Sequence, residues 1–438
     1  MPQPHKTAGA LANDLASNLA NGLATEAVDA EANGTPQAPP TPVRSRAQHV
    51  LLGISMVLIG LNLRPVFSSV SALLPEIMAG TGMSAGGASL LTSIPILCLG
   101  LFAPLAPRLA MRFGTEKALL GILLLLLAGS ALRGTGSVAW LFIASGMAGA
   151  AIAMGNVLMP GLVKRDFSAK AGLMTGLYTM AVCAGAAAAA GLTLPLSHAL
   201  GDRWDLALAA WALPVILVAA LWTPQALRAG RAAGGRHTGL RVRGLWRDKL
   251  AWQVTLYMGL QSGLAYAVMG WLAPILRDRG LDGVTAGWVI SASVMTQVFA
   301  CLLLPSFAIR LRNQSLLNVV LALLAGVCLL AMLFAPLTWV WPIAVVLGLA
   351  QGGLFSVCMT LIVLRTPDAH VAAQLSSMAQ SVGYLIASTG PFMIGRLHEW
   401  TGSYGGAAWV FIVTSLGAAW FGFGAGRAML VKAQVTQV

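Results

Sequence analysis

An arginine lies in the middle of the first long apolar stretch of the chain, residues 49–78. At helical rise, Arg64 would lie about 20 Å into a hydrocarbon core about 30 Å thick. A charge at that depth costs at least about 3 kcal/mol, so it needs a water-filled cavity, a polar partner or an anion. We therefore predict that Arg64 is a fixed cation that binds an anion or an electron-rich nitro group. The alternative is a structural arginine bonded to carbonyls of neighbouring helices.

The residues beside Arg64 favour a site over a plain span. Ser68 and Ser71 follow Arg64 at i+4 and i+7, which places the three side chains on one helix face. Pro65 removes a backbone donor next to the charge, so we expect a helix break there and a freed carbonyl with another partner. The middle of every apolar run lacks Asp and Glu, so the sequence offers Arg64 no permanent counter-ion.

Composition defines the class of protein. Of 438 residues, 57% are hydrophobic and 9% charged, and apolar runs of about 20 residues recur along the chain. This pattern predicts an all-α membrane protein with many spans. The five cysteines all lie in apolar runs without a CxxC pair, so we interpret them as small core residues. The basic residues lie in short loops between the spans, so the membrane accounts for the excess of basic over acidic residues and no nucleic-acid partner is needed.

Twelve spans are expected, six on each side of a long basic connection. They lie at about 49–78, 87–108, 116–135, 138–163, 171–198, 204–222, 251–276, 284–309, 314–335, 338–364, 371–396 and 404–427. The predicted domains are a disordered tail (1–48), a six-helix bundle (49–222), a basic linker (223–250), a second six-helix bundle (251–427) and a short tail (428–438).

The distribution of Lys and Arg predicts the orientation. With both termini in the cytoplasm, 21 of the 27 basic residues fall on the cytoplasmic side and 5 on the other, and Arg64 is the remaining one. The positive-inside rule therefore predicts cytoplasmic termini. The linker carries seven of these residues, which fits either a clamp for anionic lipid or a solvated cytoplasmic segment.

The two halves repeat each other at an offset of about 199 residues. Asn62 and Pro75 match Gln261 and Pro274, with 13 residues from the amide to the proline in both halves. Two parallel six-helix halves joined by a basic loop resemble the plan of the major facilitator superfamily, whose site lies between the halves at mid-membrane. That resemblance implies two pseudo-symmetric six-helix bundles.

The signature of this superfamily between spans 2 and 3 is only partly present. Leu109, Ala110, Arg112 and Gly114 fit the motif, but Met111 replaces its aspartate. The charge-relay gate attributed to the motif is therefore in question here, and Glu116 with Lys117 is a candidate substitute pair. Arg112 stays a candidate gating residue.

A more specific resemblance begins at Arg64 itself. The stretches Gly60-Leu-Asn-Leu-Arg-Pro65 and Leu73-Leu-Pro-Glu-Ile77 resemble the cyanate and nitroimidazole permease family (CynX/NimT type). The likeness continues in residues 89–95, 159–165, 211–214, 259–266, 271–274 and 348–353. It implies a permease for small molecules in a bacterial inner membrane, with cyanate and nitroimidazole marking the range of the family.

Further candidate site residues are single polar side chains within the spans. Asn62 and Gln261 occupy equivalent positions that face the cavity in this fold, although amides between helices serve equally well as packing contacts. The other candidate substrate-binding residues are Asn156, Tyr178, Tyr266, Gln351, Gln380 and Tyr384. Glu76, near the outer end of span 1, is a candidate for gating or coupling, and its alternative is an exposed carboxylate at a helix end.

Together these features predict a transporter that works by alternating access. No intramembrane catalytic group is present, so we do not expect an enzyme, and we expect no cofactor or metal. The expected partners are a small-molecule substrate, in the first place a small anion, and membrane lipid around a monomer. Since no histidine lies mid-span, we expect weak or absent proton coupling. Uptake of a cyanate-like anion and efflux of nitroimidazole-like or other drug-like compounds both remain open.

Overall fold

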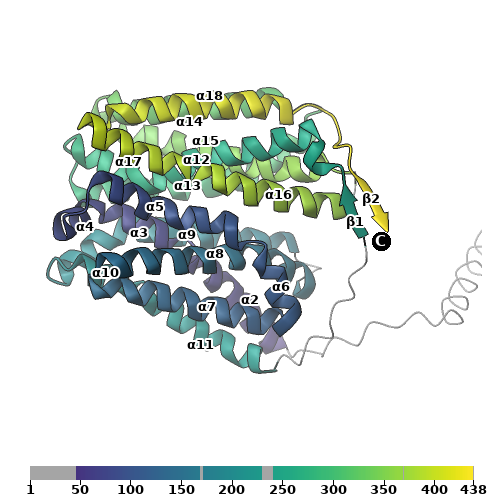
Figure 1. Cartoon of the computed structure of the whole chain (residues 1–438), viewed down its shortest axis with the longest axis horizontal. Helices are drawn as coiled ribbons and strands as arrows, with labels where there is room; N and C mark the ends of the chain where they lie inside the picture. The colour runs from purple at the N-terminus through teal and green to yellow at the C-terminus, as the bar shows by residue number, and fades with distance from the viewer. Residues whose placement is uncertain (1–45, 168–170, 229–239, 368, 438) are drawn as a thin grey trace, which may run out of the picture. The chain divides into compact units, whose positions relative to one another are not determined.

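The structure is a computed structural model that describes residues 46–167, 171–228, 240–367 and 369–437. Residues 51–438 form one compact unit, and the description that follows concerns that unit. Helices make up almost all of its described residues, as the long apolar runs predict (Figure 1).

The first half of the unit contains the helices drawn from purple to teal in Figure 1. They are α2 (Arg46–Asn62), α3 (Pro65–Ala72), α4 (Leu74–Thr81), α5 (Ala85–Phe102), α6 (Leu105–Phe113), α7 (Thr115–Leu132), η1 (Arg133–Thr135), α8 (Val138–Asp166), α9 (Ala171–Ala199), α10 (Trp204–Ala210) and α11 (Ala212–Arg228).

The second half contains the helices drawn from green to yellow in Figure 1. They are η3 (Leu245–Arg247), α12 (Lys249–Asp278), α13 (Gly283–Arg310), α14 (Ser315–Phe334), η4 (Leu337–Trp339), α15 (Val340–Leu364), α16 (Ala369–Ala387), α17 (Thr389–Thr401), η5 (Tyr404–Gly406) and α18 (Ala407–Ala425).

The described residues contain eleven helices that are long and apolar enough to cross a membrane. They correspond to eleven of the twelve expected spans. The remaining one, at 371–396, is divided between α16 and α17 at Ser388. Part of the predicted linker is helical, because α11 continues to Arg228 before the undescribed residues 229–239.

Helix starts and ends follow local chemistry. Asp248 and Asp282 accept backbone hydrogen bonds from Ala251 and Thr285, at 2.8 and 2.9 Å, and so cap α12 and α13. Ser84 caps α5 in the same way through the backbone N–H of Gly87 at 3.2 Å. Gly402 ends α17 with a left-handed φ of 67°, a conformation that favours glycine. The side chains of Asp248, Asp282 and Ser84 accept hydrogen bonds from N–H groups that the first turn of a helix leaves free.

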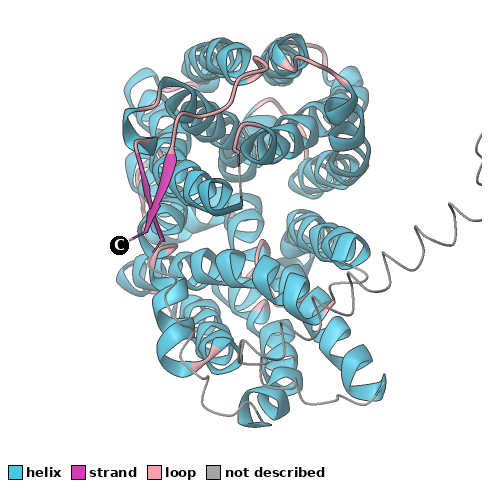
Figure 2. Ribbon diagram, turned by 90° about the vertical axis from the view of Figure 1, so that its right-hand side faces the viewer, coloured by secondary structure: helices cyan, strands magenta, loops and turns pink. Residues whose placement is uncertain are grey.

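Two strands that the sequence did not predict join the linker to the C-terminal segment. β1 (Leu240–Arg243) pairs antiparallel with β2 (Gln434–Gln437), with Leu240 opposite Gln437 (Figure 2). The same segment is fixed to helix ends: the backbone N–H of Lys432 donates to Asp248 at 2.9 Å, and that of Val431 to the Arg365 carbonyl at 2.9 Å. Arg365 in turn donates from Nε to the Ala425 carbonyl at the end of α18.

We call the end of the helices near α6 and β1 the basic side, and the end near α4 and α10 the opposite side (Figure 1). Helices of the two halves pack directly on each other: α13 on α9, α12 on α3, and α5 on both α16 and α17. Small residues permit this approach. A Cβ on Gly287 would lie 2.3 Å from the Ala190 carbonyl oxygen, inside the run of Ala and Gly at 184–191.

Candidate substrate-binding site

The helix break expected at Pro65 is present. α2 ends at Asn62, α3 begins at Pro65, and Arg64 lies between them with φ −114° and ψ −22°. Because proline has no N–H, the Leu61 carbonyl four residues before it lacks its helical donor. That oxygen lies where the side chain of Gly185 would be, since a Cβ there would come within 1.9 Å of it. The break therefore packs closely against α9.

A second arginine, Arg133, binds the backbone of α3. Arg133 is 2% exposed, and it donates from one Nη to the Val66 carbonyl at 3.2 Å and from the other to Ser145 Oγ at 3.3 Å. Val66 belongs to the first turn of α3, so Arg133 holds the segment that follows Arg64. The positive-inside count treats Arg133 as a loop residue, whereas the structure buries it inside the first half.

The Arg64 side chain reaches across to the second half of the chain. Its Nη1 lies 3.6 Å from the Met269 sulfur, and its guanidinium carbon lies 5.6 Å from the centre of the Tyr266 ring. Both of these residues belong to α12. Of the residues that the structure describes, none forms an ion pair with Arg64. The guanidinium thus has π and sulfur contacts, which leaves its charge available to a bound anion.

Arg64 lines a cavity of about 210 Å³ between the two halves. Eight of the nine candidate substrate-binding residues line it, and they come from both halves. These residues are Arg64, Asn156, Tyr178, Gln261, Tyr266, Gln351, Gln380 and Tyr384. The cavity wall among the described residues contains no Asp, Glu or Lys, so its one formal charge is that of Arg64.

Three candidates lie elsewhere. Asn62 is 3% exposed and donates from Nδ2 to the Leu58 carbonyl of its own helix at 2.8 Å, and unlike Gln261 it does not line the cavity. Glu76 lies in α4 on the opposite side, and Arg112 is exposed on α6 with its guanidinium over the Phe113 ring. Ser68 and Ser71 are buried but do not line the cavity, and their hydroxyls have no hydrogen-bond partner.

The polar groups of the wall are joined into short networks with spare capacity. Tyr178 donates to Asn156 Oδ1 at 3.4 Å, and Gln297 donates to Gln351 Oε1 at 3.4 Å. Gln261 donates to Ser262 Oγ at 2.8 Å. An amide has two donors and an acceptor with two lone pairs, so these groups can still bind the polar edge of a solute.

Several wall residues were missed in the sequence. Gln297 is a single amide within an apolar run, so the criterion that identified Gln351 would have found it. Ser262, Met269, Cys183, Cys301, Phe355 and Met359 also line the cavity. Their residue types are ordinary in a packed span, and only the fold distinguishes them. No cluster of three or more His, Cys, Asp or Glu among the described residues could hold a metal.

An ion pair joins the two halves on the opposite side. Arg277 of α12 donates both Nη groups to the Glu76 carboxylate of α4, at 2.6 and 2.9 Å. The two side chains are 24% and 27% exposed. Glu76 is therefore a paired residue that links the halves, whereas the sequence suggested an exposed carboxylate as the alternative.

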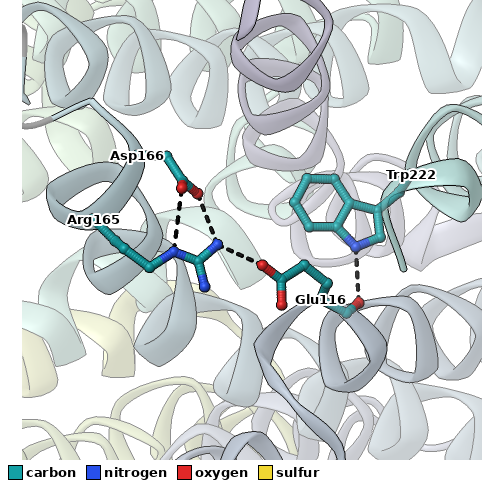
Figure 3. Close-up of polar contacts among 4 residues, drawn as sticks. All are labelled: Glu116, Arg165, Asp166 and Trp222. Carbon is teal, nitrogen blue, oxygen red and sulfur yellow. Dashed lines mark hydrogen bonds and ion pairs between the residues drawn. The ribbon is translucent and has the colours of Figure 1, made fainter. Parts of the chain in front are cut away.

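On the basic side, a charged cluster lies within the first half (Figure 3). Arg165 of α8 donates to Glu116 at 2.5 Å and to Asp166 at 2.8 Å, and Trp222 donates its indole N–H to the Glu116 carbonyl at 2.9 Å. Burial lowers the pKa of Arg165, but its hydrogen bond to Asp166 and the charge of Glu116 raise that pKa overall. Glu116 is thus paired with Arg165, which is remote in sequence, whereas Lys117, its expected partner, is exposed.

The fold and a polar cavity between two helical halves are those of a solute transporter. A family model for the Major Facilitator Superfamily matches residues 52–391, and the chain belongs to that family. It is accordingly a transport protein with many spans in the plasma membrane.

Its relatives agree with the resemblance at Arg64. The chain is 38% identical to the uncharacterized transporter YycB of Bacillus subtilis (strain 168), over 83% of this chain and 91% of that protein. It is 35% identical to the 2-nitroimidazole transporter of Escherichia coli (strain K12), over 87% and 97%. Identity to the cyanate transport protein CynX of Escherichia coli (strain K12) is 30%, over 80% and 90%.

Solved structures share the architecture at low sequence identity. An inward-facing, occupied crystal structure of a bacterial homologue of the human lysosomal transporter Spinster matches with a TM-score of 0.69. It is 16% identical in sequence, with 88% of this chain and 98% of that chain covered. The likeness shows that the two proteins have the same fold.

Proposed function

We propose that this protein carries a small anionic or polar solute, cyanate-like in charge, by alternating access, with Arg64 as the substrate-binding cation. The carrying observation is the guanidinium of Arg64 at the cavity wall, without an ionic partner among the described residues. A fixed cation beside neutral amides and tyrosines favours a solute with one negative charge. A second negative charge would lose its hydration without gaining a cationic partner in the cavity.

The extent of the cavity and the contacts between the halves suggest how the site opens to each side in turn during transport. The cavity wall extends from Arg64 toward the basic side as far as Pro160, near the end of α8, and Met359, near the end of α15, whereas the Glu76–Arg277 pair joins the halves on the opposite side. We take the basic side as cytoplasmic, as the positive-inside rule predicts, with both termini there. The described state is then inward-facing, and rocking of the two halves would expose Arg64 to the other side.

We also propose that transport is uncoupled or weakly coupled to protons. The cavity wall has no carboxylate or histidine among the described residues, and such groups are the usual carriers of a coupled proton. Glu76 is engaged by Arg277, so it would first have to leave that pair.

Uptake of labelled cyanate into proteoliposomes tests this proposal. Saturable uptake by the wild type, abolished in Arg64→Ala and unchanged by an imposed pH gradient, is the expected result. The substituted protein retains all five cysteines, so it controls for reaction of cyanate with thiols. If correctly folded wild type carries neither cyanate nor other small anions, the anion proposal fails. If uptake requires a pH gradient and Glu76→Gln abolishes that requirement, the uncoupled mechanism fails.

Efflux of a nitroimidazole-like compound is the second candidate. It is supported by the 35% identity to the 2-nitroimidazole transporter and by the aromatic residues of the cavity wall. Tyr266 and Tyr384 are in edge-to-face contact, with ring centres 6.1 Å apart, and could stack on a planar ring. Counterflow of 2-nitroimidazole in the same proteoliposomes distinguishes this candidate from anion uptake.

A further inference from the structure

Two residues of α12 separate the main cavity from a second, much smaller space. Tyr266 and Met269 line both. The small space has a volume of about 10 Å³, close to the room needed for one water, and lies between α3, α5 and α12. We call Tyr266 and Met269 the partition.

The partition lies between the small space and the cavity. The wall of the small space includes Val66, Phe67 and Val70, which follow Arg64 along α3 toward Glu76. Phe67 packs against the Tyr266 ring with centres 5.3 Å apart. A solute that passes from Arg64 to the opposite side must therefore displace the partition and then separate Glu76 from Arg277.

Arg64 touches both members of the partition: its Nη1 contacts the Met269 sulfur, and its guanidinium lies over the Tyr266 ring. The Tyr266 hydroxyl is buried without a hydrogen-bond partner, so hydrogen bonding does not hold this ring in place. The guanidinium is thus the charged group that contacts the partition from the first half.

We propose that Arg64 has a second role as a latch on this partition. In the empty carrier its charge attracts the face of Tyr266 and the Met269 sulfur. An anion bound to the guanidinium competes for that charge, weakens the attraction and releases the partition, so occupancy favours opening to the opposite side. This inference rests on the proposed function only in taking an anion as the ligand of Arg64.

Native cysteines provide the test, because Cys183 and Cys301 line the cavity on the near side of the partition. A membrane-impermeant maleimide is applied to membrane vesicles of each orientation, without substrate, and modification of each cysteine is followed by peptide mass spectrometry. Label applied from the basic side should reach both thiols quickly in the wild type. Label applied from the opposite side should reach them slowly.

Arg64→Gln should raise labelling from the opposite side by roughly fivefold, the scale of a partly buried cation–π contact. Tyr266→Ala should raise it at least as much by removing the partition itself. Arg165→Gln is the matched control, since it removes another arginine of the first half that touches neither partition residue. It should leave this rate unchanged.

An Arg64→Gln rate equal to that of the wild type would overturn the latch, provided that labelling from the basic side shows an intact cavity. A rise in Tyr266→Ala alone would also overturn it, because the partition would then close without help from Arg64. The carrier is empty throughout, so these outcomes do not depend on cyanate being a substrate. Failure of cyanate uptake alone therefore leaves the latch standing.

Discussion

The first helix of each half performs a different task in this protein, although the two helices repeat each other in sequence. In the first half the path is interrupted after Asn62 and again at Leu73, which yields α2, α3 and α4. In the second half α12 runs without a break from Lys249 to Asp278. At the offset of 199, Arg64 and Pro65 correspond to Gly263 and Leu264. The charge and the break are thus specific to the first half.

The same offset relates Phe67 to Tyr266 and Val70 to Met269. The first pair are in ring contact, and all four residues border the small space beside the partition. The corresponding helices of the two halves therefore differ in chemistry: the first half supplies the cation, and the second supplies the Tyr266 and Met269 side chains that it contacts.

The largest expected effect comes from giving the first half the residue of the second. In Pro65→Leu, the new backbone N–H lets the helix continue through residue 64 and turns Arg64 away from the cavity. Uptake should fall at least about tenfold, which corresponds to about 1.4 kcal/mol. Initial uptake rates in proteoliposomes at matched protein density measure it.

Leu264→Ala, at the corresponding position of α12, is the control for Pro65→Leu because it changes no backbone donor. It should retain more uptake than Pro65→Leu. Equal activities of Pro65→Leu and the wild type would show that the break is not required to present Arg64.

The packing of the break against α9 gives the next effect. In Gly185→Ala the added Cβ would lie 1.9 Å from the Leu61 carbonyl oxygen, so α2 and α9 must separate. Overpacking of this kind costs about 1–3 kcal/mol, and the thermal midpoint of the detergent-purified protein should fall. Gly176→Ala on the same helix is the control, since its nearest atom is the Leu302 Cδ2 at 3.8 Å. Similar midpoints for the two variants would contradict the close approach.

The two ion-pair sites sharpen the comparison between halves. Glu76–Arg277 joins the halves, whereas Arg165–Glu116 lies within one of them. Glu76→Gln should therefore raise maleimide labelling of Cys183 from the opposite side, by about two- to fivefold for a partly exposed pair worth up to about 1 kcal/mol. High salt should reduce the difference between variant and wild type.

Arg165→Gln should leave that labelling rate unchanged and lower only the thermal stability of the protein. If both substitutions changed labelling from the opposite side to the same extent, the distinction between the two pairs would fail.

The smallest effect concerns the equivalent helix caps Ser84 and Asp282. Hydrogen bonds from Thr285 hold the pKa of Asp282 below its usual value. A depressed pKa contributes stability that is present above the unfolded pKa of about 4 and is lost as the pH falls through the folded pKa. Asp282→Ala should cost about 1 kcal/mol near neutral pH and progressively less below pH 4. The thermal midpoint, measured against pH, checks this.

Ser84→Ala should lower stability by a similar amount at every pH, because a hydroxyl does not titrate in this range. If the loss of stability in Asp282→Ala were also independent of pH, the prediction for Asp282 would be wrong.

Most of the fold follows from sequence because the bilayer leaves few solutions: long apolar runs must be helices, and the halves repeat. Exceptions arise where other forces act. The division at Ser388 lies three residues before Pro391, whose missing N–H leaves the Ala387 carbonyl without its helical donor, although the apolar run continues through it. The β1–β2 pair joins segments about 190 residues apart, a contact with no local pattern. The burial of Arg133 depends on the Val66 carbonyl, which sequence cannot place.

The site could be predicted where a residue type is costly in a span. Arg64 and most of the single amides and tyrosines line one cavity, because polar groups in lipid turn toward protein or water. Asn62 shows the limit of this reasoning: it occupies the position that corresponds to Gln261 in the repeat, yet its amide donates to the Leu58 carbonyl of its own helix. The partner of Glu76 was also out of reach, since Arg277 lies in the other half.

The unpaired charge of Arg64 has a consequence for the electrical balance of the cycle. With one positive charge at the cavity wall, the empty centre carries +1, and a bound monoanion makes it neutral. A membrane potential does work of about 2.3 kcal/mol per charge per 100 mV on charge that crosses the whole bilayer. The voltage would then act mainly on the return of the empty carrier, and the polarised membrane would set how fast the protein resets between solutes.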